Sequence, residues 1–137
     1  MAEVIGLASA VAGLVTLVGQ VAKLSYIFLS DIRGASKSQK LYLQEVSALT
    51  EVLLRIEQAL EVPELGVVRP SISTKTLQDC QELLGSLKTS LEKATKNSSR
   101  IEKLKSSVKW PFDENEVKKL VGMLHRYRLV LRYILTT

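Results

Sequence analysis

Apolar residues recur at alternating spacings of three and four in three separate segments of the chain. In the segment from about Ser36 to Glu61 they are Tyr42, Val46, Leu49, Leu53, Ile56 and Leu60. From about Thr74 to Lys96 they are Leu77, Cys80, Leu84, Leu87, Leu91 and Ala94, and from Asp113 to Leu135 they are Val117, Leu120, Leu124, Tyr127, Leu131 and Ile134. This spacing keeps the apolar side chains on one stripe of a helix, so the pattern predicts three amphipathic helices.

The segment before them is different, because the nineteen residues from Val4 to Ala22 carry no charge. As a helix with a rise of ~1.5 Å per residue this segment is about 28 Å long, close to the hydrocarbon thickness of a bilayer. At ~100° per residue, large aliphatic residues gather on one side of that helix. They are Val4, Leu7, Val11, Leu14, Val15, Leu17, Val18 and Val21, with Ile5 as the one large residue out of place. The opposite side carries Gly6, Ala8, Ser9, Ala12, Gly13, Thr16, Gly19 and Gln20.

Four interpretations of this first helix compete. A secretory signal is set aside, because the chain begins Met1-Ala2-Glu3 without a basic start. A permanent membrane anchor is disfavoured by the many small and polar residues, since each large aliphatic residue favours insertion by only about 0.3–0.6 kcal/mol. An ordinary core helix fits the bulky side. A helix that is stored in a bundle and released into lipid fits both sides, because small residues spaced four apart permit close helix contacts in membranes.

The residues between the segments predict where the helices begin and end. Ser36 with Gln39, and Asp113 with Glu116, have the spacing of capping boxes. The stretch Val62 to Ser73 contains two prolines and a glycine and is predicted to be a loop. A short helix is predicted near 98–108, with Ser99 and Glu102 as its cap. The predicted fold is therefore all-α, an antiparallel bundle of four long helices plus that short one, in one domain spanning 1–137.

The composition of the chain argues against several classes of site. The single cysteine, Cys80, and the single histidine, His125, exclude an internal disulfide framework and leave too few soft ligands for a structural zinc site. No nucleophile–base pair, carboxylate pair or phosphate-binding glycine loop stands out, so we expect neither an enzyme nor a cofactor. His125 is expected to be a structural or surface residue. Trp110 and Phe112 are expected to close one end of the bundle as a buried ring pair.

The net charge of +5 is concentrated in the C-terminal half. Seven bases, against two acids, are candidates for contact with anionic lipid: Lys88, Lys93, Lys96, Arg100, Lys103, Lys105 and Lys109. An ordinary solvated helix face explains the same run equally well. Nucleic acid is not an expected partner, because no known nucleic-acid-binding signature accompanies the bases and aromatic residues for stacking are scarce.

Three stretches together resemble a known family. They are "MAEVIGLASAVAGLVTL" at the start, "YLQEVSALTEVLLRIEQAL" from Tyr42 to Leu60, and "VKWPFDENEVKKLVGMLHRYRLVL" from Val108 to Leu131. They resemble the HeLo-like N-terminal domain of fungal NOD-like receptors. That family is related to the HeLo domain of the HET-S prion-system protein and to the four-helix bundle of the mixed-lineage kinase domain-like pseudokinase.

The resemblance implies the N-terminal domain of a longer protein that executes regulated cell death. It implies a cytoplasmic domain that forms a homo-oligomer when a cognate NOD-like receptor or amyloid-signalling partner activates it. The domain then moves to the plasma membrane, where the helix Val4–Ala22 inserts and makes the membrane leak. The resemblance also implies, less directly, that the basic stretch of this sequence contacts anionic lipids. The alternative, from another class, is a non-enzymatic helical adaptor that mediates signalling contacts.

Overall fold

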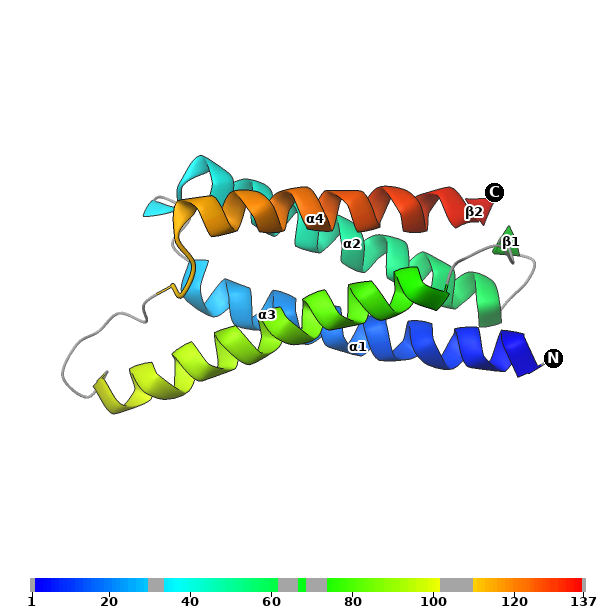
Figure 1. Ribbon diagram of the computed structural model, residues 1–137, viewed down its shortest axis with the longest axis horizontal. Helices are drawn as coiled ribbons and strands as arrows, with labels where there is room; N and C mark the ends of the chain where they lie inside the picture. The colour runs from blue at the N-terminus through cyan, green and yellow to red at the C-terminus, as the bar shows by residue number, and fades with distance from the viewer. Residues whose placement is uncertain (1, 30–33, 62–66, 69–73, 102–109, 137) are drawn as a thin grey trace.

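Four α-helices make up most of the chain in the computed structural model, which describes residues 2–29, 34–61, 67–68, 74–101 and 110–136. The helices are α1 (Ala2–Leu29), α2 (Lys37–Glu61), α3 (Thr74–Ile101) and α4 (Glu114–Ile134). Successive helices run in opposite directions along one long axis, so that both chain termini lie at the same end of the bundle (Figure 1). The prediction of an all-α antiparallel bundle is therefore confirmed.

Both predicted capping boxes are present, and they fix where α2 and α4 begin. The backbone nitrogen of Gln39 donates to the Ser36 hydroxyl at 3.1 Å, and the backbone nitrogen of Ser36 donates to the side-chain oxygen of Gln39 at 2.9 Å. Asp113 and Glu116 make the same reciprocal pair at 2.8 and 3.2 Å. Each box satisfies amide groups that have no partner inside the helix.

The helices pack in the order α4, α2, α1, α3. α2 packs against both α1 and α4, and α1 also packs against α3. α2 and α4 are parallel, and their first turns are joined where the Ser36 hydroxyl donates to the Glu114 carboxylate at 3.2 Å. α1 therefore makes close contacts with two helices, α2 and α3.

The predicted stripes form the core. Most of the repeat positions in α2, α3 and α4 are buried. Four of them are partly buried: Leu60, Ala94, Leu120 and Tyr127. The central members, such as Leu49, Leu53, Leu84 and Leu124, have no exposed surface. Burial of these apolar side chains supplies the main driving force for folding.

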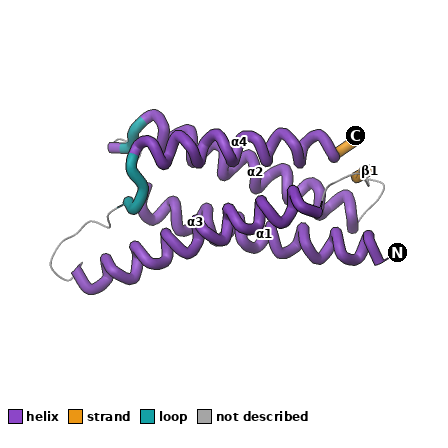
Figure 2. The backbone as a smooth tube through the Cα atoms, in the orientation of Figure 1, coloured by secondary structure: helices purple, strands orange, loops and turns teal. Residues whose placement is uncertain are grey.

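The aromatic residues before α4 lie at one end of the bundle, as expected, but Trp110 and Phe112 are only partly buried and belong to a cluster larger than a pair. The Trp110 ring meets Phe112 edge-on with centroids 5.2 Å apart, and it also meets Tyr42 at 5.5 Å and Phe28 at 5.8 Å. Edge-to-face contacts of this kind add to the stabilisation from buried area. The loop that carries Trp110 therefore connects α1, α2 and α4 (Figure 2).

Two details differ from the sequence prediction. α3 continues without interruption to Ile101, so Ser99 lies inside a long helix and does not begin a separate short one near 98–108. The remainder of that predicted helix, 102–109, lies outside the described residues. In addition, the expected loop after α2 contributes strand β1 (Val67–Val68), which pairs antiparallel with β2 (Leu135–Thr136) directly after α4.

Candidate functional site

The two sides of α1 are separated in space as the sequence pattern predicts. Val11, Leu14, Val18 and Val21 are buried, with Leu7, Val15 and Leu17 partly buried beside them. Every predicted member of the small-residue side is exposed: Gly6, Ala8, Ser9, Ala12, Gly13, Thr16, Gly19 and Gln20. The side chains of Val4 and Ile5 lie outside the described part of the chain.

The exposed side of α1, which we call the small face, lies in open space. A Cβ atom built on Gly6, Gly13 or Gly19 meets no heavy atom within 4 Å. The Thr16 hydroxyl donates to the carbonyl oxygen of Ala12 at 3.1 Å, so its polarity is satisfied within the helix itself. This surface presents little side-chain bulk and no charge between Gly6 and Gln20.

α1 has the length and composition of a membrane span. Among the described residues, Gly6–Leu29 is the one helical segment long and apolar enough to cross a bilayer, with a mean hydropathy of 1.6. Core helices of soluble proteins and signal sequences have the same length and composition. Core helices are mostly buried, however, and only 22% of the most apolar part of this span is buried. α1 therefore lies along one side of the bundle and is not enclosed by it.

One buried hydrogen bond joins α1 to α2. The hydroxyl groups of Ser25 and Tyr42 lie 2.7 Å apart, and both side chains are fully buried. Burial raises the pKa of Tyr42 to about 12, although the bond to Ser25 acts in the opposite direction, so the phenol stays neutral. Among the described residues we find no other side-chain hydrogen bond or ion pair from α1 to another helix.

The basic residues predicted to contact lipid do not form one surface within the described chain. Lys88 is half-buried and Lys93 is exposed, both on α3. Five residues of separation turn a helix by roughly 500°, so their side chains leave it about 140° apart. The side chains of Lys96 and Arg100, and all of Lys103, Lys105 and Lys109, lie outside the described part. α3 also ends at the opposite end of the bundle from the N-terminus of α1 (Figure 1).

A polar cluster between α2 and α4 was not predicted. The Glu45 carboxylate accepts from Arg128 Nε at 2.8 Å and Nη2 at 3.3 Å, and its Oε1 lies 3.1 Å from His125 Nδ1. Burial alone would raise the pKa of Glu45, but the hydrogen bonds from Arg128 and His125 and their charges outweigh it and lower that pKa. His125 is thus a surface residue in an ion-pair cluster, consistent with the structural role expected of it.

The described residues hold no group of three or more His, Cys, Asp or Glu side chains placed to bind a metal ion. No family model, curated protein or solved structure matches this chain. The HeLo-like resemblance thus remains a hypothesis based on the three quoted stretches.

Proposed function

We propose that this protein is a membrane-permeabilising domain whose first helix leaves the bundle and inserts into a bilayer. The observation that carries this proposal is the exposure of the whole small face of α1, a helix of membrane-spanning length whose residues 4–22 carry no charge, while its aliphatic side is buried. The HeLo-like resemblance supports the same role, with the plasma membrane as the target and oligomerisation of the parent protein as the trigger.

The contacts of α1 are of a kind that lipid replaces well. Within the described part of the chain, the contacts of α1 with other helices are apolar except for the hydrogen bond between Ser25 and Tyr42. Acyl chains therefore offer Val11, Leu14, Val18 and Val21 an environment equivalent to the core. A helix attached by many ion pairs would lose those pairs on entering lipid. Among the described residues, α1 has one buried polar contact to lose, the bond between Ser25 and Tyr42.

In water, the same contacts keep the helix in place. Exposing four fully buried aliphatic side chains costs about 1.5–3 kcal/mol each, or roughly 6–12 kcal/mol in all. That is comparable with the whole stability of a typical domain, about 5–15 kcal/mol. Release therefore needs a membrane or an assembled oligomer to offset this free-energy cost. In their absence, α1 stays packed in the bundle.

The small face gives the inserted helices a way to associate. Ser9 and Gly13, and Ala12 and Thr16, are pairs of small residues four apart on this face. In lipid such pairs allow two helix backbones to approach closely. The same face would thus be solvent-exposed at rest and form helix contacts in the membrane.

Dye release from anionic vesicles tests this function. With vesicles of phosphatidylcholine and phosphatidylserine, we expect the wild-type chain to release dye and Gly13→Glu to do so far less. A charged residue near the bilayer centre costs about 2.5–3.5 kcal/mol, which corresponds to a reduction on the order of a hundredfold. The Gly13 site has room for the new side chain, so the folded bundle should be unaffected.

Gly122→Glu is the matched control. Gly122 is also an exposed helical glycine with open space around it, but it lies on α4. The two variants have the same charge and gain the same side chain, so Gly122→Glu should release dye like the wild type. Equal losses in both variants would mean that added negative charge repels the vesicles, and the proposal would fail.

The adaptor alternative also has an observation in its favour. The outer surface of α4 exposes four large apolar side chains, Met123, Leu129, Val130 and Tyr133. Exposed apolar residues grouped on one helix are typical of protein-contact surfaces. If the wild-type chain leaves vesicles sealed at every concentration, a domain that docks partners through α4 becomes the better explanation.

A further inference from the structure

A small groove lies between α2 and α4, at the half of the bundle where the chain ends. Its volume is about 120 Å³, and Val52 and Leu135 contribute apolar walls. Its charged lining residues are three arginines, Arg55, Arg128 and Arg132, and one acid, Glu51. Three positive charges and one negative charge give this lining an excess of positive charge, which favours an anionic ligand.

The acids near the groove leave one guanidinium uncompensated. Glu51 pairs with Arg55 at 2.8 Å, and Glu45, which is not among the lining residues, pairs with Arg128 at 2.8 Å. Arg132 makes no side-chain hydrogen bond or ion pair within the described residues. Within the described residues, Arg132 is therefore the arginine of this groove that has no acid partner to compete with an anion.

Arg128 is held in position before any ligand arrives. Its Nε and Nη2 atoms bond to Glu45, Nη2 also lies 2.8 Å from His125 Nδ1, and its side chain is only 17% exposed. These contacts use Nε and Nη2 and leave the two Nη1 hydrogens uncommitted within the described chain. A side chain fixed in this way loses little conformational freedom when it binds a ligand.

We propose that this groove, which we call the arginine groove, is a binding site for a phosphate monoester held by Arg55, Arg128 and Arg132. A phosphate monoester carries a charge of about −1.5 to −2 at neutral pH and offers three strong acceptor oxygens. Guanidinium groups match phosphate oxygens with paired N–H donors, and three arginines line one small volume here. The ligand is either a soluble phosphate compound or the headgroup of a phosphomonoester lipid.

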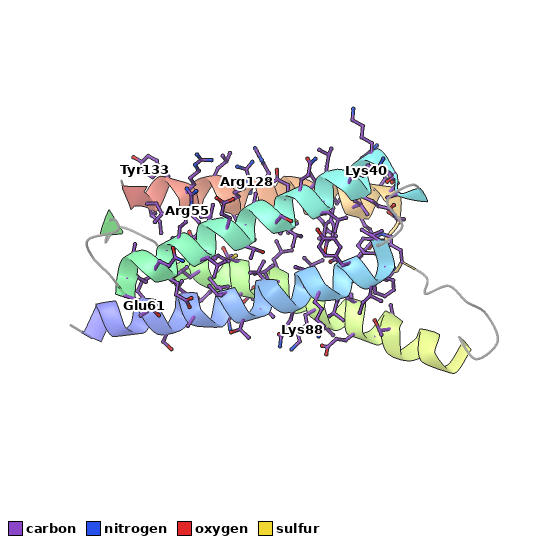
Figure 3. All side chains as sticks on the ribbon, turned by 180° about the vertical axis from the view of Figure 1, so that it is seen from behind. Lys40, Arg55, Glu61, Lys88, Arg128 and Tyr133 are labelled. Carbon is purple, nitrogen blue, oxygen red and sulfur yellow. The ribbon has the colours of Figure 1, made fainter. Side chains whose placement is uncertain are left out.

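The position of the groove fits a lipid source. Arg55 and Arg128 lie on neighbouring helices along one side of the bundle, and Arg55 lies toward the end where the N-terminus of α1 is found (Figure 3). The arginine groove therefore lies toward the end from which the N-terminus of α1 would enter a bilayer.

Titration of the 137-residue chain with glycerol 3-phosphate, followed by calorimetry, tests the site. We expect saturable binding that weakens about tenfold or more in Arg132→Gln, because hydrogen bonds to charged groups contribute about 1.5–3 kcal/mol. Arg126→Gln is the matched control, since Arg126 is an exposed arginine of the same helix that does not line the groove. It should change the affinity less than twofold.

Sedimentation with vesicles distinguishes the two sources of phosphate. Binding to vesicles that contain phosphatidic acid should fall in Arg132→Gln and be displaced by glycerol 3-phosphate if the ligand is a lipid. If only the soluble compound binds in an Arg132-dependent way, the ligand is a soluble phosphate. Absence of saturable binding, or equal weakening in Arg126→Gln and Arg132→Gln, would overturn the site.

The phosphate-binding proposal and the permeabilising proposal can be contradicted independently of each other. A chain that binds glycerol 3-phosphate through Arg132 but leaves vesicles sealed retains the site and loses the proposed function. A chain that releases dye but shows no Arg132-dependent phosphate binding retains the function and loses the site.

Discussion

The hydroxyl groups of Ser25 in α1 and Tyr42 in α2 share a 2.7 Å hydrogen bond inside the bundle. Both side chains are completely buried, and the residues around them are mainly aliphatic and aromatic. Either hydroxyl can be the donor, so each is the other's partner. The pair therefore fixes the register of α1 against α2 more specifically than apolar contacts do.

The two hydroxyl groups of this pair should contribute non-additively to the free energy of unfolding. Ser25→Ala leaves the Tyr42 hydroxyl buried without its partner, which should lower the free energy of unfolding by about 1–3 kcal/mol. Tyr42→Phe should cost less, because a serine in a helix has a backbone carbonyl within reach. In the double variant neither hydroxyl remains, so its loss should be smaller than the sum of the two single losses. Urea unfolding of the four proteins measures this, and strict additivity would contradict the coupling.

Mutations on the buried side of α1 should lower the free energy of unfolding far more than mutations on the small face. Leu14→Ala removes a side chain that is 2% exposed and should lower the free energy of unfolding by about 2–5 kcal/mol. Thr16→Ala, two residues away on the small face, should change it by no more than about 0.5 kcal/mol. Thermal and urea unfolding measure both. A large loss in Thr16→Ala would mean that the small face is buried against something in solution.

Most features that depend on residues close together in the sequence were predicted correctly. Apolar spacing placed the buried stripes, and the Ser36–Gln39 and Asp113–Glu116 pairs placed two helix starts, because each signal lies within a few neighbouring residues. The two sides of α1 followed from the same helical periodicity. The predicted helix start at Ser99 was wrong, because the Ser–Glu spacing of a capping box is equally compatible with the interior of a helix.

What the sequence could not provide depends on how distant helices meet. Glu45 and Arg128 are 83 positions apart, and only the parallel packing of α2 on α4 brings them together. The three-residue spacing of His125 and Arg128 was the one local signal of that cluster. Likewise, Trp110 and Phe112 predicted an aromatic pair, but nothing local indicated that Phe28 and Tyr42 would join it.

The Glu45–Arg128 pair should make stability depend on pH. Because the pKa of Glu45 is lower in the folded protein than its ordinary value of 4.5, the folded state binds fewer protons than the unfolded state near that pH. This contribution is fully present above pH 4.5 and is lost as the pH falls through the lowered pKa. Glu45→Gln should remove it, with a loss of about 1 kcal/mol at pH 7 for a pair near the surface.

Urea unfolding of wild type and Glu45→Gln between pH 7 and pH 3 measures that contribution. The difference in stability between the two proteins should be largest at neutral pH and should shrink below pH 4.5. Subtracting the variant removes the effect of all other carboxylates. A difference that stays constant over this range would show that Glu45 is not protonated differently in the folded and unfolded states.

The thiol of Cys80 should report the release of α1. Cys80 is fully buried in the core that α1 helps to close, and burial raises its pKa to about 12. Only the thiolate reacts readily with disulfide reagents, so labelling of the folded chain in buffer should be slow and limited by opening of the bundle. If α1 moves into lipid, anionic vesicles should accelerate labelling by tenfold or more, because the inserted state exposes α3.

Gly13→Glu makes this measurement specific to insertion. Its labelling in buffer should equal that of the wild type, because the substituted side chain points into open space. With vesicles present it should remain slow, whereas Gly122→Glu should be accelerated like the wild type. Equal acceleration in all three proteins would show that the vesicle surface unfolds the domain as a whole. In that case α1 has no separate role, since Cys80 becomes accessible whether or not the helix is able to enter the bilayer.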